Sequence, residues 1–370
     1  MSSQTGTRHV WLDVARGYGI FLVFYGHLVE PFADQRLPGA FATFKFVYAF
    51  HMPLFFVLAG WLAKQSQPFG DALRRGVLAR VVPAVFFNLL AMLPWLPPSP
   101  LATGLPDGAL AEGLLRILQG RPNFNFLTWF LYCLFVVELI HVGLRRIARS
   151  EWAIALSILC LLAVGQAIAF RLEAFAQATG LPKHLWYVDE ALVAAGFHQV
   201  GFLAARLSAR VTELPSAAVA LCLAVAALGV TLMLYDLNQG PFTWYKPIVA
   251  MSMSSHGHPL WFPVAALAGA VAVIALARAT EANAVAAWLG RYSLPLFGLN
   301  TLWITFVNPE LAVRFASALP DDPLGLGALL LLGGAVSLAT TAPIAWALVR
   351  SVPQLVGRPR VRGPWLPALL

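Results

Sequence analysis

Apolar runs of about 20 residues recur along the whole chain, and short polar or Pro- and Gly-rich breaks separate them. Each run is long enough to cross the hydrocarbon core of a bilayer as an α-helix. We therefore predict an all-α polytopic membrane protein with about ten transmembrane helices and no separate soluble domain, residues 1–370 forming a single membrane domain. The predicted spans cover residues 10–30, 41–63, 81–97, 126–144, 152–170, 187–206, 215–235, 259–278, 284–306 and 324–349.

The composition excludes an ordinary soluble protein. Of the 370 residues, 59% are hydrophobic and only 11% are charged, whereas soluble domains carry about 25% charged residues. The 25 Lys and Arg residues outnumber the 17 Asp and Glu residues, which gives a formal net charge of +8. The basic residues concentrate in alternate loops between the predicted spans, as is typical of loops that stay in the cytoplasm. We therefore expect both termini to be cytoplasmic, and we expect no nucleic-acid partner.

Neither the cysteines nor the histidines indicate a metal centre. Cys133, Cys160 and Cys222 each lie in an apolar segment, so we expect no disulfide framework and no cysteine-bound metal. His256 and His258 flank one glycine in a predicted outer loop, but no carboxylate or third ligand stands near them in the sequence.

Charged and titratable residues inside a span are candidates for function, because an ionisable side chain costs about 2.5–3.5 kcal/mol at the centre of a membrane helix. The first span carries Asp13, Arg16, His27 and Glu30. Eleven helical residues return Arg16 and His27 to within about 20° of the same face and separate them by roughly 16 Å along the axis. One helix thus presents a cation near one membrane surface and an imidazole in the opposite half.

Two interpretations of this span stay open. In the first, Arg16 holds an anionic group at the cytoplasmic mouth, while His27 and Glu30 exchange a proton in the outer half. In the second, Asp13 and Arg16 form an interfacial ion pair, and His27 and Glu30 reach the outer surface of the membrane.

The second span contains the string AFHMPLFFVLAGWLAK, which places His51 close to Pro53 near the middle of the membrane. A proline inside a span frees a backbone carbonyl and bends the helix, which is tolerated beside a cavity or a polar neighbour. His51 therefore either faces a polar cavity or is a core histidine that is hydrogen-bonded to a neighbouring helix.

Basic residues precede the third span. Arg74, Arg75 and Arg80 lie in the inner loop DALRRGVLARVVPAV. Guanidinium groups bind phosphates bidentately, so these residues suit a phosphorylated ligand. Positive-inside topology alone also accounts for them.

Amide and aromatic side chains begin the fourth span, where Asn123, Asn125 and Trp129 stand at its outer end. Amides and ring faces are groups that bind sugars, but amphipathic aromatic residues also belong at any membrane interface.

These segments together resemble the acyltransferase 3 family of integral membrane acyltransferases, and in particular its fucose 4-O-acetylase-like branch. The stretches that carry the resemblance are LDVARGYGIFLVFYGH, FHMPLFFVLAGW, RRGVLARVVPA, TWFLYCLFVVE and WLGRYSLPLFGLN. The ten residues between Arg16 and His27 and the string HMPLFF are its specific parts. The chain departs from the family pattern at Ala59, where a serine is usual, and at Asn300, where a histidine is frequent.

The resemblance implies transfer of an acyl group, often acetyl from cytoplasmic acetyl-CoA, to a hydroxyl of a carbohydrate or other envelope molecule. The family's essential histidine and arginine match His27 and Arg16. The positions that the family associates with the donor match Arg75 and Arg80. The implied location is a bacterial inner (plasma) membrane, where membrane lipid surrounds the helices.

Our leading hypothesis is a membrane O-acyltransferase with acetyl-CoA or another acyl-CoA as donor, a carbohydrate or glycan as acceptor, and no metal. The candidate catalytic residues are His27, Glu30 and His51, and the candidate donor-binding residues are Arg16, Arg75 and Arg80. The alternative is a transporter or flippase for an anionic or glycosylated substrate. A transporter should show paired broken helices in related halves, and only the second span shows an obvious break in the sequence.

Overall fold

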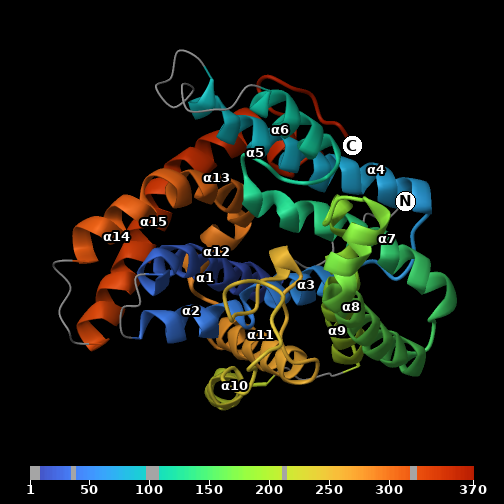
Figure 1. Cartoon of the computed structure of the whole chain (residues 1–370). Helices are drawn as coiled ribbons and strands as arrows, with labels where there is room; N and C mark the ends of the chain where they lie inside the picture. The colour runs from blue at the N-terminus through green and yellow to red at the C-terminus, as the bar shows by residue number, and fades with distance from the viewer. Residues whose placement is uncertain (1–8, 35–38, 97–107, 211–214, 317–322) are drawn as a thin grey trace.

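The computed structural model describes residues 9–34, 39–96, 108–210, 215–316 and 323–370, and within these ranges the chain is helical with no β-strand. This confirms the predicted all-α class (Figure 1). The helices are α1 (Val10–Asp34), α2 (Ala40–Tyr48), α3 (His51–Trp61), α4 (Phe69–Gly76), α5 (Val82–Met92), α6 (Ala109–Leu118), α7 (Trp129–Ile147), α8 (Glu151–Thr179), α9 (Val188–Ser208), α10 (Ala217–Leu234), α11 (Trp261–Ala279), α12 (Ala284–Arg291), α13 (Ser293–Phe306), α14 (Asn308–Ala316) and α15 (Pro323–Ser351).

Eight helical segments among the described residues are long and apolar enough to cross a membrane. They are 40–61, 69–95, 126–147, 151–179, 185–208, 217–234, 261–279 and 325–351. The other two predicted spans correspond to α1 and to the pair α12 and α13. The charged and imidazole residues of α1 are five: Asp13, Arg16, His27, Glu30 and Asp34. The chain is an integral membrane protein, and the ten-span arrangement stays a prediction.

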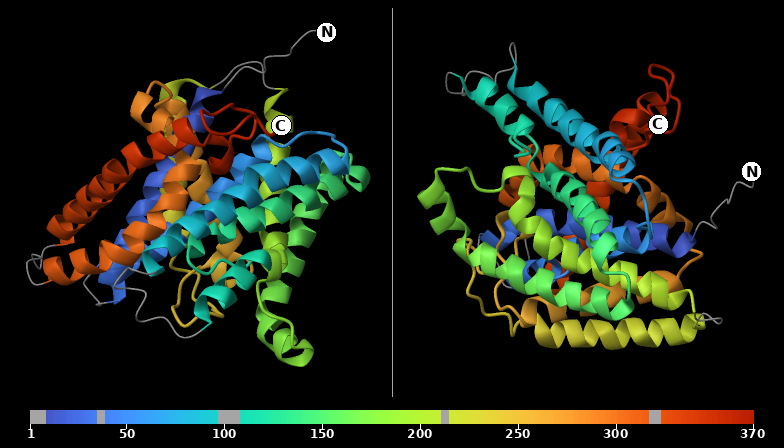
Figure 2. Two further views of the ribbon diagram at one scale, coloured as in Figure 1. Left: turned by 90° about the horizontal axis from the view of Figure 1, so that it is seen from above. Right: turned by 90° about the vertical axis from the view of Figure 1, so that its right-hand side faces the viewer.

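The helix that carries Arg16 and His27, α1, lies at the centre of the molecule. Figure 1 shows α1 surrounded by other helices, and it packs against α2, α3, α11, α12, α13, α14 and α15. By contrast, α10 packs mainly on α11 at the edge of the bundle, and only 22% of its apolar window is buried (Figure 2). The protein thus presents its apolar edge helices to lipid and shields the charges of α1 with other helices.

Two glycines let α1 and α12 approach closely. A Cβ atom on Gly17 would lie 2.0 Å from the backbone oxygen of Ala286, and one on Gly290 would lie 1.7 Å from that of Asp13. Such contacts are far inside van der Waals distance, so a larger residue at either position forces the helices apart. This contact brings Arg16 and Arg291 to the same end of the bundle.

We expect Gly17→Ala to lower the free energy of unfolding by about 1–3 kcal/mol, the usual cost of overpacking. Thermal unfolding of the purified protein in detergent measures the effect. Gly229→Ala on α10 is the matched control, because nothing lies within 4 Å of its added Cβ. Equal melting temperatures for the two variants would contradict the close contact between α1 and α12.

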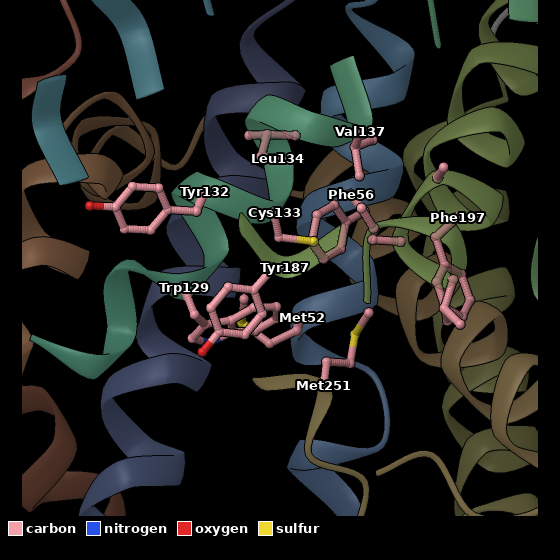
Figure 3. Packing of buried hydrophobic residues seen from close by; sticks show 14 of the residues in the cluster. Met52, Phe56, Trp129, Tyr132, Cys133, Leu134, Val137, Tyr187, Phe197 and Met251 are labelled. Atoms are coloured by element: carbon pink, nitrogen blue, oxygen red, sulfur yellow. The ribbon is translucent and has the colours of Figure 1, made fainter. Parts of the chain in front are cut away.

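The largest buried cluster joins α3, α7 and α9, and Figure 3 shows Phe56, Cys133 and Phe197 among its members. Tyr132 and Cys133 have no exposed surface, and Met52 is 7% exposed. This packing fixes α3 and α7 relative to each other. Cys133 is a free buried thiol, while Cys160 and Cys222 are free and exposed on α8 and α10.

The break in the second span lies earlier than the sequence predicted. The helix is interrupted at Ala49 and Phe50, and His51 begins a new helix, α3. Pro53 then falls in the first turn of α3, where its missing N–H removes no helical hydrogen bond. The interpretation of Pro53 as a mid-helix kink is therefore wrong.

A second break separates α12 from α13 at Tyr292, whose backbone is at φ −104° and ψ 9°. The sequence had shown an obvious break only in the second span, so this one was missed. Pro295 follows Tyr292 by three residues and lies in the first turn of α13.

The C-terminal segment, residues 352–370, folds back against the helices after α15. Arg358 donates a hydrogen bond to the backbone oxygen of Arg291 at 2.7 Å, and Arg74 donates to that of Leu369 at 3.2 Å. Gly357 lies against Leu294, so this segment packs against the start of α13.

Candidate active site

An arginine-lined cavity of about 640 Å³ opens at one end of the bundle. Residues of α1, α3, α4, α7, α9, α12, α13 and the C-terminal segment line it. Its charged and imidazole side chains are Asp13, Arg16, Lys64, Arg75, Arg80, Glu138, His141, His198, Arg291 and Arg358.

The charge of this cavity suits a polyanion. Its described lining includes six cationic side chains and two carboxylates, which is an excess of four positive charges. The guanidinium of Arg80 pairs with Glu138 at 2.8 Å, and Arg16 lies 3.9 Å from Asp13. Guanidinium groups clustered in a partly enclosed cavity attract phosphates strongly, because little water screens them there.

All three predicted donor-binding residues, Arg16, Arg75 and Arg80, line the arginine-lined cavity. Arg74 does not, since its hydrogen bond goes to the C-terminal segment. The ion pair between Asp13 and Arg16 exists, as the second interpretation required, but both partners belong to the cavity wall rather than to an isolated surface pair.

The cavity also holds Lys64, Arg291 and Arg358, which the sequence pattern indicated only as basic residues of cytoplasmic loops. Two imidazoles of the lining, those of His141 and His198, were not predicted either. His198 is 1% exposed, and its Nδ1 has no hydrogen-bond partner in the described part of the chain. His141 is held by the side-chain amide of Gln199 and the backbone oxygen of Lys64, each at 3.0 Å.

The inner end of the cavity is apolar and aromatic. Ile20, Met52, Phe55, Phe130 and Phe297 line it there. The ring of Phe130 lies 5.9 Å from that of Phe55 and 5.6 Å from that of Phe297, so three helices contribute to one aromatic cluster. A long flexible ligand arm fits this end better than a charged group does.

His27 does not line the cavity; it lies beyond the aromatic end. Seven residues separate it from Ile20 on α1, or roughly 10 Å of helix. Its ring packs edge-on against Phe126 at 5.7 Å, one turn of chain before Phe130. The side chain is 8% exposed. The helix α1 thus carries a cavity cation at one level and a buried imidazole further along, as the sequence predicted.

Three polar groups hold His27. Its Nδ1 lies 3.0 Å from the hydroxyl of Tyr48 and 3.4 Å from Oε2 of Glu30. Its backbone oxygen accepts a hydrogen bond from the side chain of Asn308 at 3.2 Å. With a proton on Nδ1, the imidazole donates toward these oxygens and leaves Nε2 as the accepting nitrogen.

Glu30 is not simply a surface residue, because its other oxygen, Oε1, accepts a hydrogen bond from Nζ of Lys246 at 2.7 Å. His51 lies on the other side of Tyr48, with the two rings 4.7 Å apart. The Nδ1 of His51 donates to the backbone oxygen of Val47 at 2.9 Å, and the side chain is buried. His51 is thus near His27, does not line the arginine-lined cavity, and is hydrogen-bonded within the core.

Of the residues singled out at the start of the fourth span, Asn125 and Trp129 lie in packing positions, whereas Asn123 is exposed. Asn125 is fully buried and bonds to Gly298 and Thr301, and Trp129 is 4% exposed, so neither offers a sugar-binding surface. His256 is paired with the buried carboxylate of Glu190 at 2.9 Å. Within the described ranges, no group of three or more His, Cys, Asp or Glu residues lies close enough together to hold a metal ion.

Comparison with known proteins settles the family. A family model described as an acyltransferase domain matches residues 9–350, which is most of the chain. The chain belongs to the acyltransferase 3 family. This confirms the resemblance seen in its motifs, and the matched region includes the cavity arginines of α1, α4 and α12 as well as His27.

Two curated relatives, each named nodulation protein NolL, align with part of the chain. The one from Sinorhizobium fredii (strain NBRC 101917 / NGR234) is 25% identical over 161 residues, which is 42% of each chain. The one from Mesorhizobium japonicum (strain LMG 29417 / CECT 9101 / MAFF 303099) is 34% identical over 93 residues, or 25% of this chain and 24% of that one. The matched segments span less than half of either relative. No solved structure matches the chain.

Proposed function

We propose that this protein is a membrane O-acyltransferase that transfers acetyl from acetyl-CoA to a hydroxyl of a carbohydrate or cell-envelope glycan. The observation that carries the proposal is the arginine-lined cavity, whose aromatic inner end points along α1 toward His27. Family membership supports acyl transfer in general.

The cavity supports CoA as donor because CoA combines several phosphates with a long neutral arm. The phosphates suit Arg75, Arg80, Arg291 and Arg358 at the open end. The pantetheine arm then extends past Phe130 along the apolar inner end. A helix rise of roughly 16 Å between Arg16 and His27 is comparable with the length of that arm.

His27 is our general base. Its Nε2 takes the proton of the acceptor hydroxyl while the hydroxyl oxygen attacks the thioester carbonyl carbon. The carbon–sulfur bond then breaks, the acetyl group stays on the acceptor oxygen, and the CoA thiolate leaves and receives a proton. Glu30 and Tyr48 hold Nδ1, which orients the ring and stabilises the imidazolium that forms.

The cavity end of the bundle faces the cytoplasm in this proposal, since the basic residues collect there and acetyl-CoA is a cytoplasmic metabolite. His27 then lies toward the outer half of a bacterial inner membrane. This arrangement keeps both termini in the cytoplasm.

The test is incubation of the purified protein with radiolabelled acetyl-CoA and a panel of glycans, with acetyl transfer and free CoA measured together. We expect both products in equal amounts with at least one glycan. Calorimetry with CoA alone should show saturable binding. Absence of both CoA binding and transfer, together with glycan uptake by proteoliposomes that contain the protein, would favour a transporter and contradict the proposal.

A further inference from the structure

A lysine far from the first span in sequence reaches the candidate base. Lys246 lies in the segment of residues 236–258 between α10 and α11 and is only 7% exposed. Its ammonium stands 5.1 Å from the ring centroid of Trp244 and 5.6 Å from those of Phe44 and Tyr245. A buried ammonium is costly unless anionic partners compensate it.

The partners of Lys246 are two carboxylates of α1. Its Nζ donates to Oε1 of Glu30 at 2.7 Å and to Oδ2 of Asp34 at 3.1 Å. Burial by itself would lower the pKa of Lys246, but the hydrogen bonds and charges of these carboxylates outweigh it and raise the pKa above its ordinary value. The side chain therefore stays charged over the pH range in which an acyltransferase is assayed.

This arrangement forms a chain of contacts with His27 at its end. Lys246 holds one oxygen of Glu30, and the other oxygen, Oε2, is 3.4 Å from Nδ1 of His27. Without the ammonium, the Glu30 carboxylate can rotate away from the imidazole or take up a proton, because it is then partly buried beside Asp34 without a cation.

We propose that Lys246 is a positioning residue that fixes Glu30 against His27, and that it sets the rate of acyl transfer without contacting donor or acceptor. The proposal rests on the proposed function. Lys246 acts through Glu30 alone, so its effect on turnover should vanish when Glu30 no longer carries a charge.

The competing role is anchoring of the 236–258 segment, which the same ion pairs can provide. Two other contacts separate these roles. Asp34 also binds Lys246 but does not contact His27, so Asp34→Asn weakens the anchor while leaving Glu30 in place. Lys45 pairs with Asp236 at 2.8 Å, so Lys45→Met loosens the same segment at a different point.

The experiment measures kcat and the KM for acetyl-CoA for Lys246→Met, Lys246→Arg, Glu30→Gln and the Lys246→Met/Glu30→Gln double variant. We expect Lys246→Met to lower kcat roughly 10- to 100-fold, the range seen when outer-shell partners of a functional group are removed, with KM for acetyl-CoA unchanged. Lys246→Arg should restore most of the loss. The double variant should be no slower than Glu30→Gln, because interacting residues are not additive.

A kcat for Lys246→Met within twofold of the wild type would overturn the proposal. So would additive losses in the double variant, or losses of equal size in Asp34→Asn and Lys45→Met, which would indicate anchoring. These outcomes are distinct from failure of the proposed function, which would show as a wild-type protein that transfers no acetyl group.

Discussion

His27→Ala is expected to abolish acyl transfer while the protein still folds and binds CoA. Loss of a general base typically slows a reaction by about 10²- to 10⁴-fold. The imidazole lies outside the arginine-lined cavity, so CoA affinity measured by calorimetry should stay near that of the wild type. Turnover is followed by release of free CoA in the presence of the acceptor.

His258→Ala is the control, because the contacts of its imidazole within the described residues are the backbone N–H groups of Leu260 and Trp261 and the ring of Trp261, at the start of α11. His51→Ala separates the two candidate bases. We expect a smaller loss from it than from His27→Ala, since the Nδ1 of His51 is bonded to Val47 within the core. Near-wild-type turnover in His27→Ala, with an inactive His51→Ala, would assign the base to His51.

The Arg75→Gln/Arg80→Gln double variant is expected to weaken acetyl-CoA binding by about 100-fold. Hydrogen bonds to charged groups contribute about 1.5–3 kcal/mol each, and 1.4 kcal/mol is a tenfold change in affinity. Loss of Arg80 also leaves Glu138 without its partner beside the donor phosphates. The KM for the acceptor should be nearly unchanged, which steady-state kinetics at saturating acetyl-CoA can measure.

Arg74→Gln is a close control for this variant. Arg74 precedes Arg75 on α4 but does not line the cavity. We expect donor affinity within about twofold of the wild type for Arg74→Gln, the range of a surface charge effect. If Arg74→Gln weakens binding as much as the double variant does, the basic residues act only through the general charge of that surface.

Much of the architecture could be predicted because membrane helices are defined by length and hydrophobicity, which are local properties of the sequence. The same holds for the polar face of α1, since helical periodicity places Arg16 and His27 on one side. The positions of the helix breaks were harder to predict from the sequence. The sequence predicted a kink at Pro53, but the helix is interrupted at Phe50. Pro53 then lies in the first turn of α3, where its missing N–H removes no helical hydrogen bond.

The site residues that could not be predicted come from elements distant in the sequence. Arg291 and Arg358 reach the cavity because α12 packs on α1 and the C-terminal segment folds back, and neither contact leaves a local pattern. Lys246 lies 216 residues from Glu30, so their pairing could not be read from spacing. Asn125 had been interpreted as an interfacial residue, yet tertiary packing buries it completely.

The most direct test of the account is an experimental structure of the protein with bound acetyl-CoA. We predict the phosphates among Arg75, Arg80, Arg291 and Arg358, and the pantetheine arm passing Phe130 so that the thioester carbonyl comes within reach of a hydroxyl bound at Nε2 of His27. Phosphates bound elsewhere, or a thioester that ends on the cavity side of the aromatic cluster with no path to His27, would contradict it.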